Sequence, residues 1–275
     1  MSFEQHAQMH GLMVRHAISD GRWHRVPTVD KPKKRNGAYI WDGERGVVRN
    51  WATMEGYAKY PDRQEAWKDI KLRVFDDSAE KIRQARVAKH AQEMIRQAVY
   101  DKHAYFAAKG FPDMKGLVLN DELLIPMRDF VTYEPMSIQR IKPDGEKRFL
   151  AGGKTKNTVF IINKKFMNVG VYLCEGFATG LSIQTGLEAL FRNAAVVVCF
   201  SASNMIHVGR QIKRACVFAD HDDTGIRAAE ELGFPWMKSE AAGEDANDLH
   251  MRAGVMALRK ALSELSPASP RKLRG

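Results

Sequence analysis

Apolar and polar positions alternate in short runs over residues 20–52, and the turn signals Asp-Lys-Pro, Asn-Gly and Asp-Gly separate these runs. The pattern predicts two or three antiparallel strands. Residues 77–109 are instead rich in Ala, Lys, Arg and Gln and contain neither Pro nor Gly, which predicts one long helix. Because the apolar stripe of this helix is narrow, we expect it to connect two modules.

Strand signals return between residues 115 and 162, where apolar runs are separated by polar turns such as Pro143-Asp144-Gly145. They predict a compact antiparallel module. From residue 169 the rhythm changes to continuous apolar strands that alternate with helical segments, which is typical of a parallel sheet covered on both faces. The strands predicted in this last part are 169–173, 195–200 and 215–219.

The chain is therefore predicted to be an α/β protein whose C-terminal domain has a central parallel sheet. Before that domain we expect a small N-terminal β-rich module, a helical connector and a basic, antiparallel, strand-rich module. The expected boundaries are 1–75 for the N-terminal module, 76–112 for the connector, 113–168 for the strand-rich module, 169–265 for the C-terminal domain and 266–275 for a disordered tail.

Charge is distributed unevenly along the 275 residues. The chain carries 43 Lys and Arg against 33 Asp and Glu, a net charge of +10, whereas residues 169–275 hold 12 of each sign. The excess positive charge of the first 168 residues favours a polyanionic partner such as nucleic acid. No apolar stretch approaches the roughly 18–20 residues of a membrane span, and the start lacks the apolar core of a secretory signal, so we expect a cytoplasmic protein.

The three cysteines, Cys174, Cys199 and Cys216, each lie inside an apolar run. No Cys-x-x-Cys pair and no histidine at zinc-ligand spacing accompanies them. We interpret them as reduced core residues, and no zinc site is expected.

Two of the predicted parallel strands end in acidic residues. In an open parallel sheet, ligands bind at the carboxyl ends of the strands, and carboxylates that converge there repel one another unless a cation neutralises them. Oxygen ligands favour Mg²⁺ or Mn²⁺. The alternative is that the second group only caps the helix that follows, but one acid suffices for a cap. The two strand ends read Glu175-Gly176 and Asp220-His221-Asp222-Asp223-Thr224-Gly225.

Glu-Gly after one strand and Asp-x-Asp-x-x-Gly after a later one resemble the signature of the Toprim domain, which bacterial-type primases, type IA and type II topoisomerases and some nucleases share. The resemblance covers roughly residues 169–262. It implies that Glu175, Asp220 and Asp222 are catalytic and that Gly176 and Gly225 are turn glycines. The segment 245–250 is similar to a late Asp-rich element of phage and plasmid Toprim primases. The metal ligands implied in this way are Glu175, Asp220, Asp222, Asp223 and Asp248.

The strand-rich module is similar to the basic subdomain that precedes Toprim in bacterial, phage and plasmid primases. Residues 124–129 and 137–154 carry this resemblance. It implies a groove that faces the acidic site and holds template, primer or nucleotide phosphates. The alternative is a solvated hairpin edge that lysines protect from aggregation. The basic residues concerned are Arg140, Lys142, Lys147, Arg148, Lys154 and Lys156.

Two further patterns limit the range of functions. Gly152-Gly153-Lys154-Thr155 looks like the end of a nucleotide-binding loop, but the earlier glycine of GxxxxGK[ST] would fall at Arg148, which excludes that motor class. The N-terminal module interleaves aromatic with basic residues. They suit stacking on single-stranded nucleic acid, or alternatively form the core of a small sheet. The aromatic residues are Trp23, Tyr39, Trp41 and Trp51.

Taken together, the resemblance implies a DNA primase of phage or plasmid type without a cysteine zinc ribbon. Such an enzyme is a nucleotidyltransferase that makes short RNA primers on single-stranded DNA with Mg²⁺ or Mn²⁺. The implied partners are the DNA template, ribonucleoside triphosphates and a separate replicative helicase in a bacterial cytoplasm, with no membrane. Two alternatives stay open: a metal-dependent Toprim nuclease, and a non-catalytic single-stranded-DNA-binding replication accessory protein.

Overall fold

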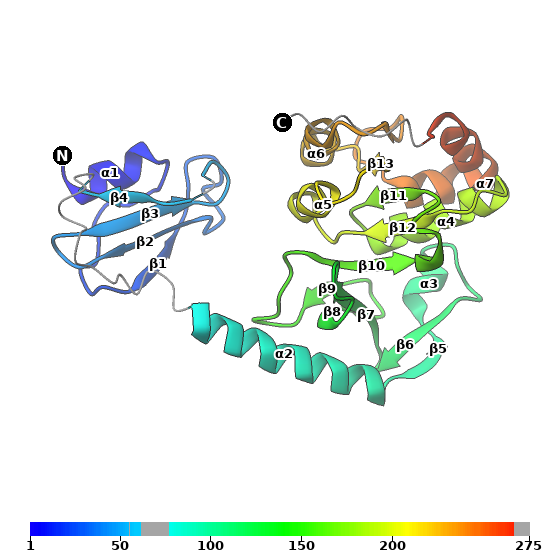
Figure 1. Ribbon diagram of the computed structural model, residues 1–275, viewed down its shortest axis with the longest axis horizontal. Coiled ribbons are helices and arrows are strands. Elements are labelled where there is room, and N and C mark those ends of the chain that lie inside the picture. The colour runs from blue at the N-terminus through cyan, green and yellow to red at the C-terminus, as the bar shows by residue number, and fades with distance from the viewer. Residues whose placement is uncertain (55, 62–76, 267–275) are drawn as a thin grey trace. The chain divides into compact units, whose positions relative to one another are not determined.

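The computed structural model describes residues 1–54, 56–61 and 77–266. The chain divides into two compact units, unit 1 (Met1–Phe75) and unit 2 (Asp76–Gly275), which Figure 1 colours from blue to red along the chain. The disordered tail predicted at 266–275 lies, from residue 267 on, outside the described residues. In the part of the chain that the structure describes, no helix combines the length and the apolar character needed to cross a membrane.

Unit 1 is a four-stranded antiparallel sheet with one short helix, α1 (Phe3–Met9), packed on a single face. Phe3 of this helix stacks on Trp41 with ring centroids 4.5 Å apart, and both pack near the buried Tyr39. The predicted antiparallel strands are confirmed, and a further strand completes the sheet. In sheet order the strands are β1 (Trp23–Val26), β2 (Gly37–Trp41), β3 (Gly46–Asn50) and β4 (Ala58–Tyr60).

Unit 2 is built on a ten-stranded mixed sheet, which confirms the predicted fold class. Its main path runs β14-β13-β11-β12-β10-β7-β6-β5, while β8 pairs with β7 and β9 with β8. Strand β10 pairs antiparallel with both β7 and β12, so it joins the antiparallel half to the parallel half. The strands are β5 (Val99–Lys102), β6 (Lys115–Leu119), β7 (Glu122–Asp129), β8 (Pro135–Ile141), β9 (Lys147–Phe149), β10 (Thr158–Ile162), β11 (Val171–Cys174), β12 (Ala195–Val198), β13 (Cys216–Ala219) and β14 (Trp236–Lys238).

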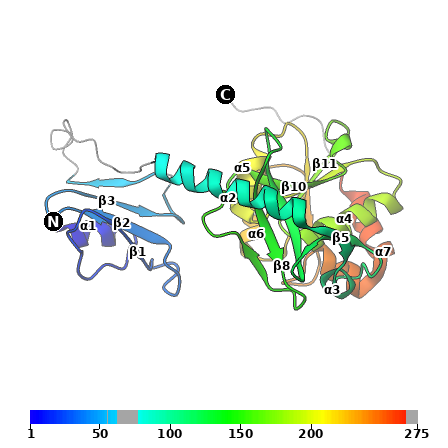
Figure 2. The same ribbon diagram turned by 90° about the horizontal axis from the view of Figure 1, so that it is seen from below.

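Helices cover both faces of the parallel half (Figures 1 and 2). Alternate residues of β11 enter two separate cores: Tyr172 packs with α4 and α7, and Leu173 packs with α5 and α6. Burial on both faces explains why these strands are apolar without alternation. Cys174, Cys199 and Cys216 are buried and free, as predicted for core residues. The helices are α4 (Phe177–Ala189), α5 (Ala202–Gly209), α6 (Asp223–Leu232) and α7 (Ala246–Glu264).

The long helix predicted for residues 77–109 is wrong beyond residue 97. Helix α2 (Asp77–Gln97) is followed by strand β5 and the short helix α3 (Ala104–Ala108). Val99 pairs with Val118 of β6, so backbone hydrogen bonds offered by the sheet edge override a helical composition. Within α2 the apolar stripe packs through Ala91 on the antiparallel half of the sheet. A short 3₁₀ helix, η2 (Lys164–Phe166), precedes β11.

Candidate active site

The two acidic strand ends of the sequence meet at one edge of the parallel sheet. Strands β11 and β13 are parallel neighbours, with Leu173 opposite Val217. Glu175 directly follows β11 and Asp220 directly follows β13. Because neighbouring parallel strands run in the same direction, both carboxylates are delivered to the carboxyl edge, where ligands of such sheets bind.

Asp220 is the most perturbed of these acids. Burial and the negative charges of Asp245, Glu175 and Asp222 raise its pKa to about 7, and Lys147 opposes this rise only in part. Its Oδ1 atom is buried and has no hydrogen-bond partner within the described residues. A buried carboxylate oxygen without a partner is costly, which makes this atom a ready ligand for a cation.

Glu175 lies half-buried beside Asp220. Burial and the charge of Asp222 raise the pKa of Glu175, whereas a hydrogen bond from the Ala202 amide and the charge of Lys147 work in the opposite direction. An acid whose pKa is moved towards neutrality is suited to accept a proton in a reaction.

Asp222 and Asp223 occupy the start of α6. Asp222 is the N-cap residue, and its Oδ1 accepts a 2.7 Å hydrogen bond from the Gly225 amide. The capping interpretation is thus correct for Asp222, although its negative charge still reaches Asp220 and Glu175. Asp223 follows in the first turn and is exposed.

A fourth carboxylate comes from Asp245, whereas the sequence pattern pointed to Asp248. Among the neighbouring charges that raise the pKa of Asp220, that of Asp245 is the largest. Asp245 caps α7, and its Oδ2 accepts a 2.9 Å hydrogen bond from the Thr179 hydroxyl. The carboxylate of Asp248 turns back to the Asp245 amide at 3.1 Å and completes a capping box. The Asp-x-x-Asp pattern of that box is the signal that identifies residue 245 as a helix start.

Neither predicted turn glycine has a positive φ, so the backbone conformation does not require glycine at these positions. Both are required instead because a Cβ would collide with a neighbouring atom. A Cβ at Gly225 would lie 2.5 Å from the Asp220 carbonyl oxygen. A Cβ at Gly176 would lie 2.8 Å from Oγ1 of Thr179, the hydroxyl that donates to Asp245. The two glycines therefore let the helices that follow approach the acidic strand ends closely.

Lys147 brings a cation from the antiparallel half to the acidic edge. Burial and the nearby Lys109 lower its pKa, while the charges of Asp245, Asp220 and Glu175 counteract that effect. Two residues along β9, the ring of Phe149 packs edge-on against Phe200 with centroids 6.2 Å apart. The Phe200 amide donates to the Glu175 carbonyl at 2.9 Å, so β9 is held against the end of the β11 strand.

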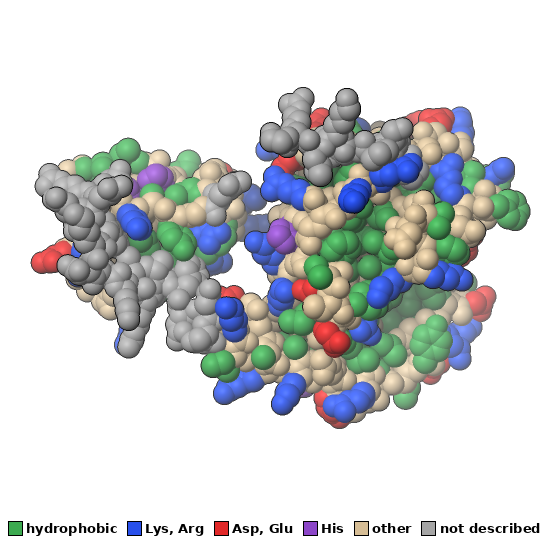
Figure 3. Space-filling view, viewed as in Figure 1, with side chains coloured by type: hydrophobic (Ala, Val, Ile, Leu, Met, Phe, Trp, Pro, Cys, Tyr) green, Lys and Arg blue, Asp and Glu red, His purple; other side chains and the backbone are tan. Residues whose placement is uncertain are grey.

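The other predicted phosphate-binding residues have different surroundings. Lys142 and Arg148 both pair with Glu146 at 2.6 Å, inside the hairpin that joins β8 to β9. Arg140 pairs with Glu122 at 3.3 Å. These pairs are exposed or half-buried and leave donor groups available to a ligand. Figure 3 shows further Lys and Arg side chains spread over the visible face of unit 2.

Lys154 and Lys156 lie on the loop before β10. Nζ of Lys154 donates to Oδ2 of the buried Asp129 at 2.7 Å, whereas Lys156 is exposed. Both are close enough to His207 for their charges to contribute to the lowering of its pKa, after the larger effect of burial. Lys154 is therefore first of all a structural ion-pair partner.

The Gly152-Gly153 pair beside Lys154 also has a structural reason. A Cβ at Gly153 would lie 2.4 Å from Oγ of Ser137 on β8, and Gly152 has a φ of +75°. The glycines thus allow a tight turn against a neighbouring strand.

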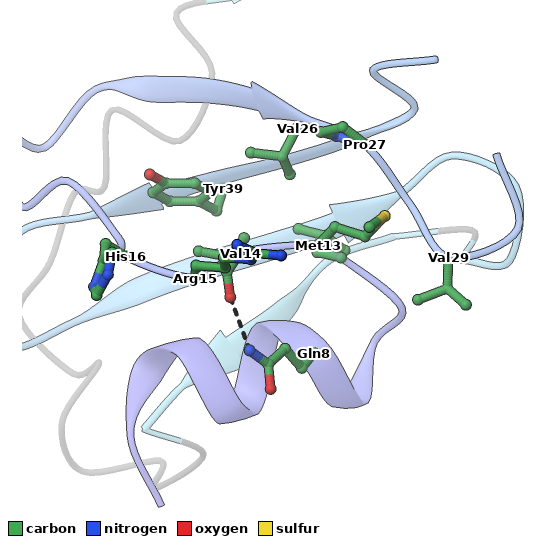
Figure 4. A pocket seen from close by; sticks show the side chains of 10 residues that line it. Gln8, Met13, Val14, Arg15, His16, Val26, Pro27, Val29 and Tyr39 are labelled. Atoms are coloured by element: carbon green, nitrogen blue, oxygen red, sulfur yellow. Dashed lines mark hydrogen bonds between the residues drawn. The ribbon is translucent and has the colours of Figure 1, made fainter. Parts of the chain in front are cut away.

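A hollow of unit 1 has a different character. It measures about 590 Å³ and is lined mainly by apolar side chains such as Val14, Val26 and Tyr39, next to the core of that unit. Figure 4 shows that the Gln8 amide is already used by the Val14 carbonyl, at 2.8 Å. Without a carboxylate in its lining, it has no ligand set for a hard cation.

The chemistry of the acidic edge fits a divalent cation. It offers carboxylate oxygens, one of them the unpaired Asp220 Oδ1, and burial together with the repulsion between the carboxylates raises the pKa of Asp220. In the described ranges, however, no group of three or more His, Cys, Asp or Glu side chains is arranged to hold one ion. Hard divalent cations that keep several waters need only one or two protein carboxylates, so the acidic edge is compatible with such an ion.

The comparison with protein families agrees with this geometry. Residues 170–255 match the sequence profile of the Toprim domain. No curated protein sequence matches the chain significantly.

Among solved structures, one similar chain comes from a complex of the bacteriophage T7 lagging-strand DNA polymerase with primase domains of two gp4 subunits, an RNA/DNA hybrid and dTTP. It has 15% identity and a TM-score of 0.42, and the match covers 62% of this chain and 95% of that one. A DNA primase domain from Pseudomonas aeruginosa has 16% identity and a TM-score of 0.37, with 54% and 53% covered, and the Aquifex aeolicus primase has 13% and 0.39, with 72% and 64% covered. This chain thus spans about half of the Pseudomonas domain and less than two thirds of the Aquifex protein. The strand order, the acidic strand ends and the sequence match together identify residues 170–255 as a Toprim domain.

Proposed function

We propose that this protein is a primase-type nucleotidyltransferase that joins ribonucleotides into short primers on single-stranded DNA. The observation that supports it most is the position of Lys147, a cation of the antiparallel half whose charge acts on Asp220 and Glu175 at the Toprim edge. A nuclease would use the same acids, with water as the nucleophile. A lysine whose charge reaches these acids is suited to hold the phosphates of a nucleotide.

Asp220 and Asp222, with Asp223 in support, are the proposed residues for Mg²⁺ or Mn²⁺, and Asp245 adds negative charge from α7. The bound ion would neutralise phosphate charge and align the reacting oxygens. Glu175 is proposed to accept the proton of the 3′ hydroxyl as that oxygen attacks the α-phosphate and pyrophosphate leaves. The carboxylate of Asp248 accepts a hydrogen bond from the Asp245 amide in the capping box of α7 and has no part in this proposal.

The remaining side chains of this proposal bind and orient the substrates. Lys147 would contact nucleotide phosphates, and the exposed donors of Arg140, Lys142 and Arg148 would hold the template or primer backbone. We also propose a replicative helicase as the partner that supplies the single-stranded template.

Primer synthesis on single-stranded DNA with labelled ribonucleotides and Mg²⁺ or Mn²⁺ tests the proposal. We expect product from the wild type and a reduction of at least about 100-fold in Asp220→Asn, since removing a metal ligand takes away several kcal/mol of transition-state stabilisation. Glu230→Gln is the matched control, because Glu230 is an exposed acid on α6, the helix that follows Asp220. Equal product from Asp220→Asn and wild type would contradict the assignment. Degradation of the DNA without incorporation would favour the nuclease.

A further inference from the structure

Trp51 of unit 1 lies on the surface beside two arginines. It follows β3, and 40% of its side chain is exposed. The guanidinium carbon of Arg25 lies 4.0 Å from the centre of its ring, and that of Arg49 lies 5.4 Å away. Trp41, by contrast, stacks on Phe3 in the core. Trp41 thus fits the interpretation of the N-terminal aromatic residues as a sheet core. The interpretation as a stacking surface is left for Trp51.

The strand register places these arginines on the face of the sheet that points away from α1. Arg25 pairs with Ala38, and Ala38 pairs with Arg49, so the two arginines lie in one row across three strands. Tyr39 and Val48, one residue along from this row, point to the opposite face and pack under α1. Successive residues of a strand alternate between faces, so the arginine row cannot belong to that core.

A basic turn ends next to Trp51. The Trp51 amide donates to the Asn36 carbonyl at 3.1 Å, and the four cations just before Asn36 are all exposed. The ion pairs that the structure describes in unit 1, His24–Asp20 and Arg45–Asp42, use none of them, nor Arg25 or Arg49. Their positive charge is therefore not neutralised by these pairs. The four residues are Lys31, Lys33, Lys34 and Arg35.

We propose that unit 1 binds single-stranded nucleic acid on the surface formed by Trp51, Arg25, Arg49 and the turn 31–35. An unpaired base stacks on the exposed indole or on the guanidinium plane next to it, and the cations hold the flanking phosphates. A duplex keeps its bases stacked inside and cannot use this contact. An apolar protein partner does not match the surrounding positive charge. This site needs neither the carboxylates of unit 2 nor a metal, so it goes beyond the proposed function.

Fluorescence anisotropy of a labelled single-stranded DNA tests the stacking contact. The parent is the full chain with Asp220→Asn in EDTA, so that the acidic site plays no part in the result. We expect Trp51→Ala to weaken binding roughly 5- to 150-fold, the range of one base–aromatic stack, and Trp51→Phe to keep most of the affinity. Phe191→Ala is the control, because Phe191 is 96% exposed but lies on unit 2.

The role of the arginines in phosphate binding is tested by salt dependence. We expect Arg25→Gln with Arg49→Gln to reduce the slope of log affinity against log salt by roughly 0.7 for each phosphate that the variant no longer neutralises. Arg22→Gln, an exposed arginine outside the proposed surface, should leave the slope unchanged. If Trp51→Ala lowers the melting temperature strongly, its affinity no longer tests the stacking contact. The affinities of Trp51→Phe and of the Arg25→Gln, Arg49→Gln variant then test the proposal.

Three results would overturn the proposal. The first is wild-type affinity in both the Trp51→Ala variant and the arginine pair at the same salt concentration. The second is equal affinity for a duplex of the same length, because a duplex offers no unpaired base. The third is displacement of the DNA by polyglutamate at equal charge concentration, which would point to an acidic protein partner. The absence of primer synthesis would leave this proposal standing, since binding is measured without a working acidic site.

Discussion

Gly225 lies so close to Asp220 that a Cβ at position 225 would be 2.5 Å from the Asp220 carbonyl oxygen. The first turn of α6 thus presses against the strand end that presents the carboxylate. The neighbour is backbone, which cannot rotate away as a side chain does. Any side chain at 225 must therefore displace Asp220 or the helix.

We expect Gly225→Ala to lower the free energy of unfolding by about 1–3 kcal/mol through overpacking. Urea denaturation followed by circular dichroism measures this change. Gly56→Ala is the matched control, because a Cβ at Gly56 would meet no atom within 4 Å. Equal denaturation midpoints for Gly225→Ala and wild type would show that the helix accommodates the methyl group.

Asp220 gives the metal-free protein a pH-dependent stability. Burial and the charges of Asp245, Glu175 and Asp222 raise its pKa from 3.8 to about 7. The unfolded chain releases this proton at lower pH than the folded protein, so stability falls as pH rises from about 4 to about 7. We expect Asp220→Asn to be more stable than wild type by about 1–3 kcal/mol at pH 8 in EDTA, and the gain to vanish near pH 4.

Thermal unfolding between pH 4 and pH 8 in EDTA tests this expectation. Adding Mg²⁺ should then stabilise the wild type and not the Asp220→Asn variant, because ligand binding to the folded state adds to stability. Glu230→Gln should follow the wild-type profile under both conditions. A wild-type stability that rises between pH 4 and pH 7 relative to Asp220→Asn would contradict the raised pKa.

The Lys154–Asp129 ion pair is expected to stabilise the loop before β10. Burial acts to raise the pKa of Asp129, but hydrogen bonds from Lys154 and from the Thr132 and Val131 amides outweigh it and hold the pKa at about 2. We expect Lys154→Ala to cost about 1–3 kcal/mol at pH 7, since it leaves a buried carboxylate without its cation.

The contribution of Asp129 is present above its unfolded pKa near 4 and disappears as pH falls towards 2. The difference between Lys154→Ala and wild type should therefore shrink between pH 4 and pH 2 in urea denaturation experiments. Lys156→Ala, an exposed lysine two residues along, should have little effect at either pH. A pH-independent difference would mean that packing, and not the charge pair, is responsible.

Lys147 and Arg148 are neighbours on β9 with different predicted roles. The charge of Lys147 acts on the acidic residues, whereas Arg148 pairs with Glu146, although both residues are exposed. We expect Lys147→Ala to reduce ribonucleotide incorporation roughly 10- to 100-fold, as when a charge-assisted hydrogen bond is removed. Arg148→Ala should reduce it by less, and neither should shift the melting temperature markedly.

Single-turnover incorporation measured over a range of nucleotide concentrations separates binding from chemistry for these two variants. A defect in Lys147→Ala that higher nucleotide concentration repairs indicates phosphate binding. Equal defects in both variants would mean that the structure does not distinguish their roles.

Local sequence was sufficient to predict three of the four parallel strands of unit 2, β11, β12 and β13, but not the short strand β14. Continuous apolar runs such as the one ending at Cys174 are typical of strands buried on both faces, and turn glycines after Glu175 and Asp220 mark where those strands end. The order of these signals predicted the fold class and the acidic edge, because strand burial and turn chemistry are properties of neighbouring residues.

Other features depended on residues far apart in the chain, so they emerged only from the folded structure. Val99 is in a strand because β6 offers it an edge, and Lys154 is held by the buried Asp129, which lies 25 positions earlier. The charge of Asp245 acts on Asp220, and the Thr179 hydroxyl of another helix donates to its carboxylate. Neighbouring residues could not predict these contacts, because each depends on a partner that only folding brings within hydrogen-bond distance.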